Sequence, residues 1–62
     1  MKFAECIQGM IEGKQYYRNQ LNEKVIIRLG DRYAEYKHEK DKYWYIYNAT
    51  RFDIESEWFL YE

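Results

Sequence analysis

Arginine and tyrosine are the residue types in this sequence best suited to bind a ligand, and they occur along the same segments. The chain of 62 residues has eight tyrosines, and its arginines lie within or beside the tyrosine-rich stretches: Arg18, Arg28, Arg32 and Arg51. A guanidinium group matches the geometry of phosphate oxygens, and tyrosine rings stack on nucleobases. The combination is typical of a site for a ligand that carries both phosphate and a base.

The same arginines have a purely structural alternative. Opposite charges pair across neighbouring strands, so Glu35, Glu55 and Glu57 are available as cross-strand partners. The three glycines are isolated, so the sequence has no Gly-rich phosphate-binding loop that would support the ligand interpretation. The residues alone therefore leave both interpretations open.

Side chains that could perform catalysis are few and lack partners. His38 is the only histidine and stands in a charged segment, which is typical of a solvated loop residue. Cys6 has no neighbouring base, and Ser56 lacks the flanking glycines of a nucleophile elbow. Glu39 and Asp41 near His38 lack the regular ligand spacing of a calcium loop. We predict that the protein is not an enzyme and has no metal site or cofactor.

The composition excludes several classes of protein. Ten Lys and Arg residues balance eleven Asp and Glu residues, which argues against a partner that is a nucleic acid polymer. The single cysteine cannot form a disulfide scaffold, and 21% aromatic residues are too many for a disordered chain. No apolar run approaches the roughly 20 residues of a membrane-spanning helix, and no secretory signal is visible. We expect a cytoplasmic protein with no membrane partner.

Changes in hydrophobic periodicity divide the chain into one helix and up to five strands. Residues 3–12 have apolar side chains at helical spacing, Gly9 permits close packing against a sheet, and Gly13 is suited to end the helix. The later segments have the β-branched and aromatic residues typical of strands: 15–18, 24–29, 32–37, 43–50 and 57–61.

Short connections separate these strands. They are a turn at 19–23, a two-residue Gly-Asp turn at 30–31, a charged loop at 38–42 and a polar connection at 51–56 with room for one helical turn. Short connections require antiparallel neighbours. We therefore predict a single α+β domain over 1–62, with one N-terminal helix packed on a four- or five-stranded antiparallel sheet.

The predicted core combines one helix face with apolar strand positions: Phe3, Ile7, Met10, Ile11, Val25, Ile27, Leu29, Ile46, Trp58 and Leu60. If Trp44 and Ile46 point toward the helix, strand alternation places Tyr43, Tyr45 and Tyr47 on the uncovered face. A chain of this size buries only about 60% of the surface that it exposes when unfolded. We therefore expect a homo-oligomer, because large aromatic side chains commonly fill interfaces.

The two ends of the chain resemble a family of small phage proteins. The pattern is an opening Met-x-Phe-x-Glu helix, then Gly-Lys and an arginine, then an aspartate with an apolar residue and a closing acid-Trp pair. It lies within 1–22 and 52–62: Met1, Phe3, Glu5, Gly13, Lys14, Arg18, Asp53, Ile54, Glu57 and Trp58. Leu21 stands where members of the family commonly have tryptophan. The best-known proteins that the pattern resembles are the anti-Thoeris sponge proteins.

The resemblance implies a non-enzymatic phage anti-defence protein that forms homo-oligomers and captures a cyclic ADP-ribose immune signal. On this hypothesis the ligand is a cyclic nucleotide-type signal in the host cytoplasm, bound between subunits. Arginines would meet its phosphates and tyrosines would stack on its bases: Arg18, Arg28, Arg51, Tyr16, Tyr45 and Tyr47.

An alternative is a small inhibitor that binds a host or defence protein through a tyrosine-rich surface. Some members of the phage family are described as inhibitors of other bacterial defences. Tyrosine and arginine suit a protein interface as well as a nucleotide site, so the sequence leaves both partners open. A structural accessory protein without a ligand is a third possibility.

Overall fold

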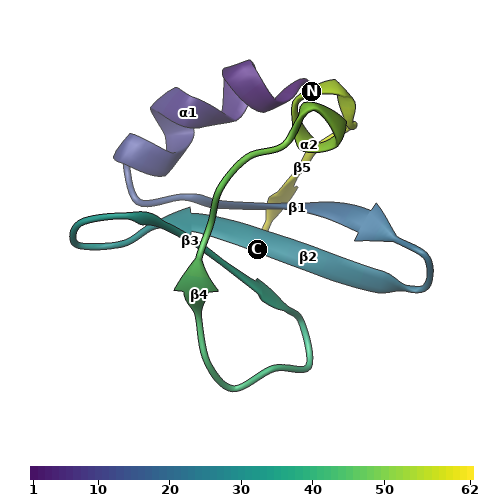
Figure 1. The fold of residues 1–62 in the computed structure, drawn as a ribbon. Coiled ribbons are helices and arrows are strands. Elements are labelled where there is room, and N and C mark those ends of the chain that lie inside the picture. The colour runs from purple at the N-terminus through teal and green to yellow at the C-terminus, as the bar shows by residue number, and fades with distance from the viewer.

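Two helices and five strands follow one another in the computed structural model, which describes all 62 residues (Figure 1). The helices are α1 (Phe3–Ile11) and α2 (Arg51–Glu55). The strands are β1 (Gln15–Gln20), β2 (Glu23–Leu29), β3 (Ala34–His38), β4 (Tyr45–Ile46) and β5 (Phe59–Tyr61). The structure confirms the predicted α+β fold, with an N-terminal helix and a five-stranded antiparallel sheet.

The five strands form one sheet in the order β4-β3-β2-β1-β5. Its central strand, β2, has the buried β-branched run Val25–Ile27, as expected where both faces of a strand are covered. The C-terminal strand β5 returns to pair with β1, so that Tyr16 lies opposite Leu60 and Tyr17 opposite Phe59. The two ends of the chain therefore meet in the structure.

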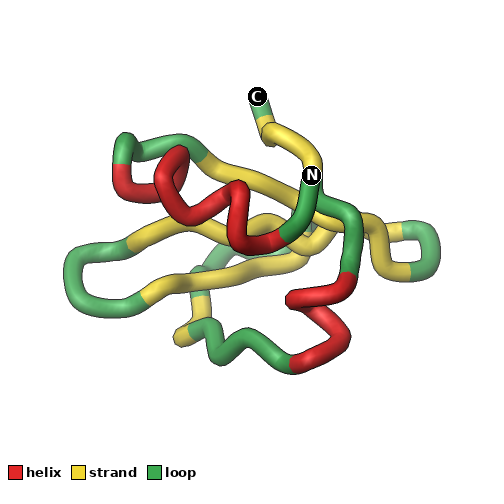
Figure 2. Tube along the Cα trace, turned by 90° about the horizontal axis from the view of Figure 1, so that it is seen from above, coloured by secondary structure: helices red, strands yellow, loops and turns green.

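Both helices lie on the same face of the sheet (Figure 1), and Figure 2, seen from above, shows them over different parts of it. Residues paired across antiparallel strands share a face, and successive residues alternate between faces. Tyr16 and its partner Ile27 belong to the core beneath α1, and we call this side the helix face. Tyr17 and its partner Ile26 lie on the other side, which we call the open face.

Three local features fix the position of α1. At its start, the Glu5 side chain accepts a 2.7 Å hydrogen bond from the backbone N–H of Lys2. After its end, Gly13 adopts a φ of 93°, which other residues reach only with strain. At Gly9, a Cβ atom would lie 1.8 Å from the hydroxyl oxygen of Tyr16, so only glycine leaves space for this ring. The predicted roles of Gly9 and Gly13 are confirmed.

The hydrophobic core is small and lies between α1 and the helix face. Only ten of the 62 residues are buried, and one cluster contains five of them: Cys6, Met10, Tyr16, Ile27 and Trp58. Phe3 packs against this cluster, with its ring centroid 5.7 Å from that of Trp58. Trp58, from the far end of the chain, is completely buried.

The predicted core was only partly correct. Four predicted residues are buried, and Phe3 packs beside them: Met10, Val25, Ile27 and Trp58. Five predicted residues are exposed instead: Ile7, Ile11, Leu29, Ile46 and Leu60. The reason in α1 is that the side with Cys6, Gly9 and Met10 faces the sheet, which leaves the neighbouring isoleucine row outside the contact.

The strand predicted at 43–50 was wrong in its length, and the condition that Trp44 and Ile46 point toward the helix is not met. Only Tyr45–Ile46 belong to β4, and the chain leaves the sheet after the Tyr47 N–H donates to the Ala34 carbonyl at 2.8 Å. Tyr45 pairs with Tyr36 on the helix face, so Trp44 and Ile46 lie on the open face. Tyr45 and Tyr47 therefore lie on the side of the helices, and Trp44 lies on the other side.

The turns also differ from the prediction. The β2–β3 connection has four residues, Gly30–Tyr33, and is closed by a 2.8 Å hydrogen bond from the Gly30 N–H to the Tyr33 carbonyl. The β1–β2 turn is shorter than predicted, because Leu21 adopts a φ of 57° that reverses the chain tightly. The helical turn expected within 51–56 is present as α2.

Candidate functional site

A hollow of about 320 Å³ opens on the helix face beside α2, and we call it the Arg18 hollow. Three strands and the segment from Tyr47 to Asp53 supply its lining: Arg18, Gln20, Val25, Tyr36, His38, Tyr47, Asn48 and Asp53. Antiparallel pairing places Arg18, Val25 and His38 side by side across β1, β2 and β3. The sheet therefore determines which side chains reach this hollow.

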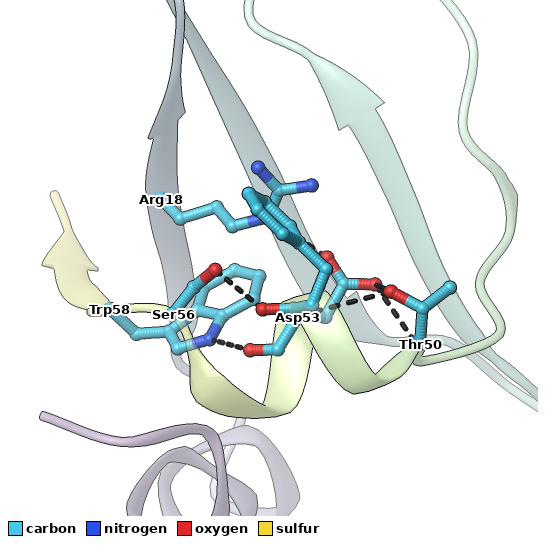
Figure 3. A network of polar contacts seen from close by, with 6 residues as sticks. Arg18, Thr50, Asp53, Ser56 and Trp58 are labelled. Atoms are coloured by element: carbon cyan, nitrogen blue, oxygen red, sulfur yellow. Dashed lines mark hydrogen bonds and ion pairs between the residues drawn. The ribbon is translucent and has the colours of Figure 1, made fainter.

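The Arg18 side chain is held by a buried ion pair, drawn in Figure 3. Its Nε donates to Asp53 Oδ1 at 2.9 Å, and both residues are buried. Its guanidinium carbon lies 5.1 Å from the ring centroid of Phe52 and 5.9 Å from that of Trp58. The carboxylate and two rings thus fix the guanidinium at the wall of the hollow.

Asp53 connects α2 to this pair and to the core. Its Oδ2 accepts hydrogen bonds from the backbone N–H and the hydroxyl of Thr50, at 3.0 and 3.1 Å, which caps the first turn of α2. Its backbone carbonyl accepts a 2.8 Å hydrogen bond from Trp58 Nε1 (Figure 3). Burial alone would raise the pKa of Asp53, but the Thr50 hydrogen bonds and the Arg18 guanidinium outweigh burial and lower it.

Three buried polar atoms around the Arg18 hollow have no hydrogen-bond partner: Arg18 Nη1, His38 Nδ1 and Tyr47 Oη. The nearest ionised group to the imidazole is Glu23 Oε2, at 3.7 Å, which is too long for a hydrogen bond. Partnerless buried polar atoms are costly and uncommon in native proteins. All three atoms belong to residues that line the Arg18 hollow, which makes this hollow the candidate site for a polar ligand.

Tyr47 stays neutral at the edge of this hollow. Burial raises the pKa of its phenol, and the nearby Asp53 carboxylate raises the pKa further. Its ring centroid lies 6.0 Å from that of Tyr36, which in turn lies 5.8 Å from that of Tyr45. A row of three tyrosines therefore borders the hollow, and Tyr45 at its end is about half exposed.

The structure brings together only part of the predicted ligand site. Arg18 and Tyr47 line the hollow, and Tyr45 adjoins it through Tyr36. Three other predicted residues lie elsewhere: Tyr16, Arg28 and Arg51. Tyr16 is enclosed in the core under Gly9, so its ring has no free face for a base.

Arg28 and Arg51 belong to other surroundings. Arg28 lies on the open face, where its Nε donates to Glu35 Oε1 at 2.9 Å, as the cross-strand alternative predicted. Arg51 is almost fully exposed on α2 and lies 3.7 Å from Glu55 on the same helix. Neither guanidinium lines the Arg18 hollow.

Sequence reasoning missed several residues of the hollow: Gln20, Tyr36, His38, Asn48 and Asp53. His38 was expected to be a solvated loop residue, but it is the last residue of β3 and is only partly exposed. The available signal was strand alternation, because His38 is two residues from Tyr36 and therefore shares its face. Asn48 and Asp53 had no such signal, since they lie after the chain has left the sheet.

A second, larger hollow of about 680 Å³ lies at the β2–β3 turn, and we call it the turn hollow. It includes three cations, Lys14, Arg28 and Arg32, and two carboxylates, Asp31 and Glu35. The turn hollow extends onto the open face, because Arg28 and Glu35 lie there. It is therefore on the other side of the sheet from the Arg18 hollow.

The cysteine is buried, and the potential metal ligands are dispersed. Burial raises the pKa of the Cys6 thiol, which lies in the core with its Sγ 3.6 Å from the Lys2 carbonyl oxygen. No three His, Cys, Asp or Glu side chains gather in a way that could hold a metal ion. Neither helix has the length and apolar character needed to cross a membrane.

The residues of the pattern at the two chain ends have structural roles in different places: Arg18 and Asp53 line the Arg18 hollow, and Gly13 and Lys14 line the turn hollow. Glu5 and Gly13 mark the start and end of α1, and Arg18, Asp53 and Trp58 form the network shown in Figure 3. Comparison with models of protein families, with curated proteins and with solved structures finds no match to this chain.

Proposed function

We propose that this chain is a non-enzymatic phage protein that sequesters a cyclic nucleotide-type immune signal in the host cytoplasm. The observation that carries the binding role is that three residues lining one hollow, Arg18, His38 and Tyr47, each have a buried polar atom without a hydrogen-bond partner. The phage origin and the class of signal rest on the resemblance of the chain ends to the anti-Thoeris sponge proteins.

The side chains of the Arg18 hollow suit a phosphate with an attached base. The free guanidinium nitrogen donates a charge-assisted hydrogen bond to a phosphate oxygen, and the Tyr47 hydroxyl donates a second one. An unpaired carboxylate would repel an anionic ligand. The Asp53 carboxylate repels it less, because it already accepts hydrogen bonds from Thr50 and Arg18. The exposed side of Tyr45 provides a surface on which a base can stack.

The size of the hollow supports a site that two subunits complete. Its volume of about 320 Å³ is at the lower end of the range for small-molecule sites. A cyclic nucleotide with two phosphates needs further walls, which a second copy of the chain would provide. Exposed apolar side chains on the helices are available for such contacts: Ile7, Ile11, Phe52 and Ile54.

The test is a titration of the purified chain with a panel of cyclic dinucleotides, cyclic ADP-ribose isomers, mononucleotides and inorganic phosphate. Calorimetry and the thermal midpoint should both identify at least one nucleotide that binds more tightly than phosphate, since a bound ligand stabilises the folded state. Sedimentation with and without that nucleotide reports the oligomer. If no member of the panel binds or raises the midpoint, the proposal is rejected.

Tyr47→Phe separates binding from folding. The hydroxyl has no partner in the unbound structure, so its removal should leave the free energy of unfolding unchanged or raise it by up to about 1 kcal/mol. The affinity for the nucleotide should fall roughly 10-fold, because one hydrogen bond to the ligand is lost. Tyr33→Phe, at an exposed tyrosine of the turn hollow, is the matched control and should change neither quantity.

A second candidate is a small inhibitor that binds a host or defence protein through its tyrosines. The observation that favours it is that Tyr33, Tyr43 and Tyr45 are all exposed. Tyrosine is common in protein interfaces, so these side chains are suited to contact a partner. A pull-down from host lysate with the native chain and with a Tyr43→Ser, Tyr45→Ser variant tests this role. A stoichiometric partner that only the native chain retains supports inhibition, whereas a nucleotide released by heating the purified protein supports sequestration.

A further inference from the structure

The open face of the sheet carries rings and cations that neither the core nor the Arg18 hollow uses. Register places aromatic and cationic side chains of four strands on this side: Tyr17, Lys24, Arg28, Lys37, Phe59 and Tyr61. Trp44 joins them from the segment before β4, as its contacts with Arg28 and Lys37 show. No helix covers this face (Figure 1).

Rings and cations alternate across this face. Lys24 Nζ lies 4.8 Å from the ring centroid of Tyr17. Farther along β2, the Arg28 guanidinium carbon lies 3.9 Å from the Trp44 ring centroid, and Lys37 Nζ on β3 lies 5.2 Å from it. Each cation is therefore held beside an aromatic ring, at a distance typical of cation–π contacts.

A second group of rings lies at the β1–β5 edge of the same face. The Tyr17 ring centroid lies 5.4 Å from that of Phe59 and 6.0 Å from that of Tyr61. Phe59 is 41% exposed although it is one of the largest apolar side chains of the molecule. An exposed ring beside other rings is a surface on which a further planar group can stack.

The charge of this face is opposite to that of the whole chain. Five cations lie on the open face or in the adjoining turn hollow: Lys14, Lys24, Arg28, Arg32 and Lys37. Four carboxylates accompany them: Asp31, Glu35, which pairs with Arg28, Glu39, which accepts a hydrogen bond from the Tyr61 hydroxyl, and Glu12, 3.7 Å from Lys14. Five cations against four carboxylates give the face a small net positive charge in a chain with a net charge of −1, so the remaining surface is acidic.

We infer that the open face binds a short single-stranded nucleic acid, with its bases on Phe59 and the partly exposed rings beside it and its phosphates on the cations. Single-strand sites in proteins combine these two elements, stacking platforms and a basic track. A duplex fits less well, because the face has no helix or protruding ribbon that could enter a groove. The overall charge of the chain is balanced, and for that reason we expected no nucleic acid polymer as a partner. That balance is the sum of a positive open face and an acidic remainder of the surface.

The composition of the face also argues against a protein partner. Aromatic residues and arginine are common at the centre of a protein interface, but lysine is depleted there, and Lys24 and Lys37 lie on this face. On the open face the only exposed aliphatic side chain of the strands is Ile46, whereas Ile7, Ile11 and Ile54 lie on the helices. Alternating lysines and rings match the regular phosphates of a nucleic acid strand better than they match such an interface.

The test measures fluorescence anisotropy of labelled oligo-dT and oligo-U of about ten nucleotides, titrated with the full-length chain in about 50 mM salt. We expect a dissociation constant in the micromolar range and a loss of affinity with added salt, with a log–log slope of about −2 to −3 for three or four phosphate contacts. A polyglutamate peptide of equal charge is the comparison. If it competes as well as the oligonucleotide, charge alone explains the binding and the inference is wrong.

Matched variants locate the binding. Phe59→Ala should weaken oligonucleotide binding about 5-fold or more through lost stacking, whereas Phe52→Ala, at an exposed phenylalanine of α2, should not. Lys37→Gln should reduce the salt slope by about 1, whereas Lys2→Gln, beside the helices, should not. Circular dichroism checks that each variant is folded.

Three outcomes overturn the inference. They are no anisotropy change up to about 100 μM protein at low salt, binding that both Phe59→Ala and Lys37→Gln leave unchanged, and self-association of the free chain that Phe59→Ala abolishes. Tyr47→Phe should not alter oligonucleotide binding, because Tyr47 lies on the other side of the sheet. Failure here therefore leaves the nucleotide-capture proposal to its own experiment.

Discussion

Two arginine–carboxylate pairs, one on each face of the sheet, have the same geometry and different surroundings. Arg18 Nε lies 2.9 Å from Asp53 Oδ1, and Arg28 Nε lies 2.9 Å from Glu35 Oε1. The side chains of the first pair are 11% and 7% exposed, and those of the second are 37% and 29% exposed. The two ion pairs have equal contact distances but contribute differently to stability, because solvent screens the second pair more strongly.

The difference extends to the function of each face. On the helix face, Asp53 joins Arg18 to α2 and to Trp58, so the pair holds the structure together although only Nε of the guanidinium has a hydrogen-bond partner. On the open face, Arg28 and Glu35 lie beside Trp44 at a hollow open to solvent. The helix face is organised around buried hydrogen bonds, and the open face around exposed rings and cations.

The largest difference between the faces should come from their aromatic residues. Trp58→Ala removes a completely buried indole and its hydrogen bond to Asp53, which should lower the free energy of unfolding by about 3–5 kcal/mol. Phe59→Ala, one residue later and on the open face, should cost about 1 kcal/mol. Chemical denaturation measures both; similar losses would contradict the contrast between the faces.

The two ion pairs give the next largest contrast. Asp53→Asn leaves the Arg18 charge buried without its counter-ion and should cost about 2–4 kcal/mol of unfolding free energy. Glu35→Gln makes the same chemical change on the open face and should cost less than about 1 kcal/mol. Urea denaturation of the two variants at neutral pH compares them directly. A larger loss in Glu35→Gln would mean that the exposed pair, and not the buried one, stabilises the fold.

Glycine substitutions should give a smaller contrast. Gly9→Ala places a methyl group 1.8 Å from the rigidly packed Tyr16 hydroxyl, and should cost about 1–3 kcal/mol despite the better helix propensity of alanine. Gly30→Ala, at the β2–β3 turn, meets the Glu35 carboxyl carbon at 2.6 Å, where a surface side chain can move aside. It should cost less than Gly9→Ala in thermal denaturation. If Gly30→Ala lowers the stability more than Gly9→Ala, the close packing of α1 against Tyr16 is contradicted.

The smallest expected effect is a change in stability with pH. The pKa of Asp53 is lowered in the folded chain from its ordinary value of 3.8, so on acidification the unfolded state takes up the proton first. The stabilisation by Asp53 should be complete well above pH 3.8 and be lost as the pH falls through the lowered pKa. Unfolding curves between neutral and acidic pH should show this decline in the native chain and in Glu35→Gln. In Asp53→Asn, the loss of stability on acidification should be smaller. If that loss is unchanged in this variant, other carboxylates cause it.

The sequence predicted much of the fold because that information is local. The β-branched run at Val25–Ile27 favours a central strand, and Gly13 favours a helix end, whatever the rest of the chain does. No local pattern showed that Arg18, Asp53 and Trp58 would be joined in one network, because they come from distant parts of the chain. Local pattern did not predict the length of β4, since aromatic side chains favour a strand but cannot show where its neighbour ends.

The candidate site was only partly predictable, because it depends on which face each residue takes. Arg18, Tyr45 and Tyr47 were predicted and lie at or beside the hollow, whereas Tyr16 fills the core. The residue types were informative, but alternation in the aromatic segment could be assigned only once Tyr45 was paired with Tyr36. His38 was missed for the same reason.

By itself, the sequence determined the order of the elements, the antiparallel sheet and the residue types available for phosphate and bases, because periodicity and turn residues act over a few positions. The tertiary structure decided which side of the sheet each arginine faces, how deeply each ion pair is buried, and that Arg18, His38 and Tyr47 share one hollow. The physical reason is that burial and proximity depend on strand register and on the packing of α2. Contacts between residues 35 positions apart, such as Arg18 and Asp53, set that packing.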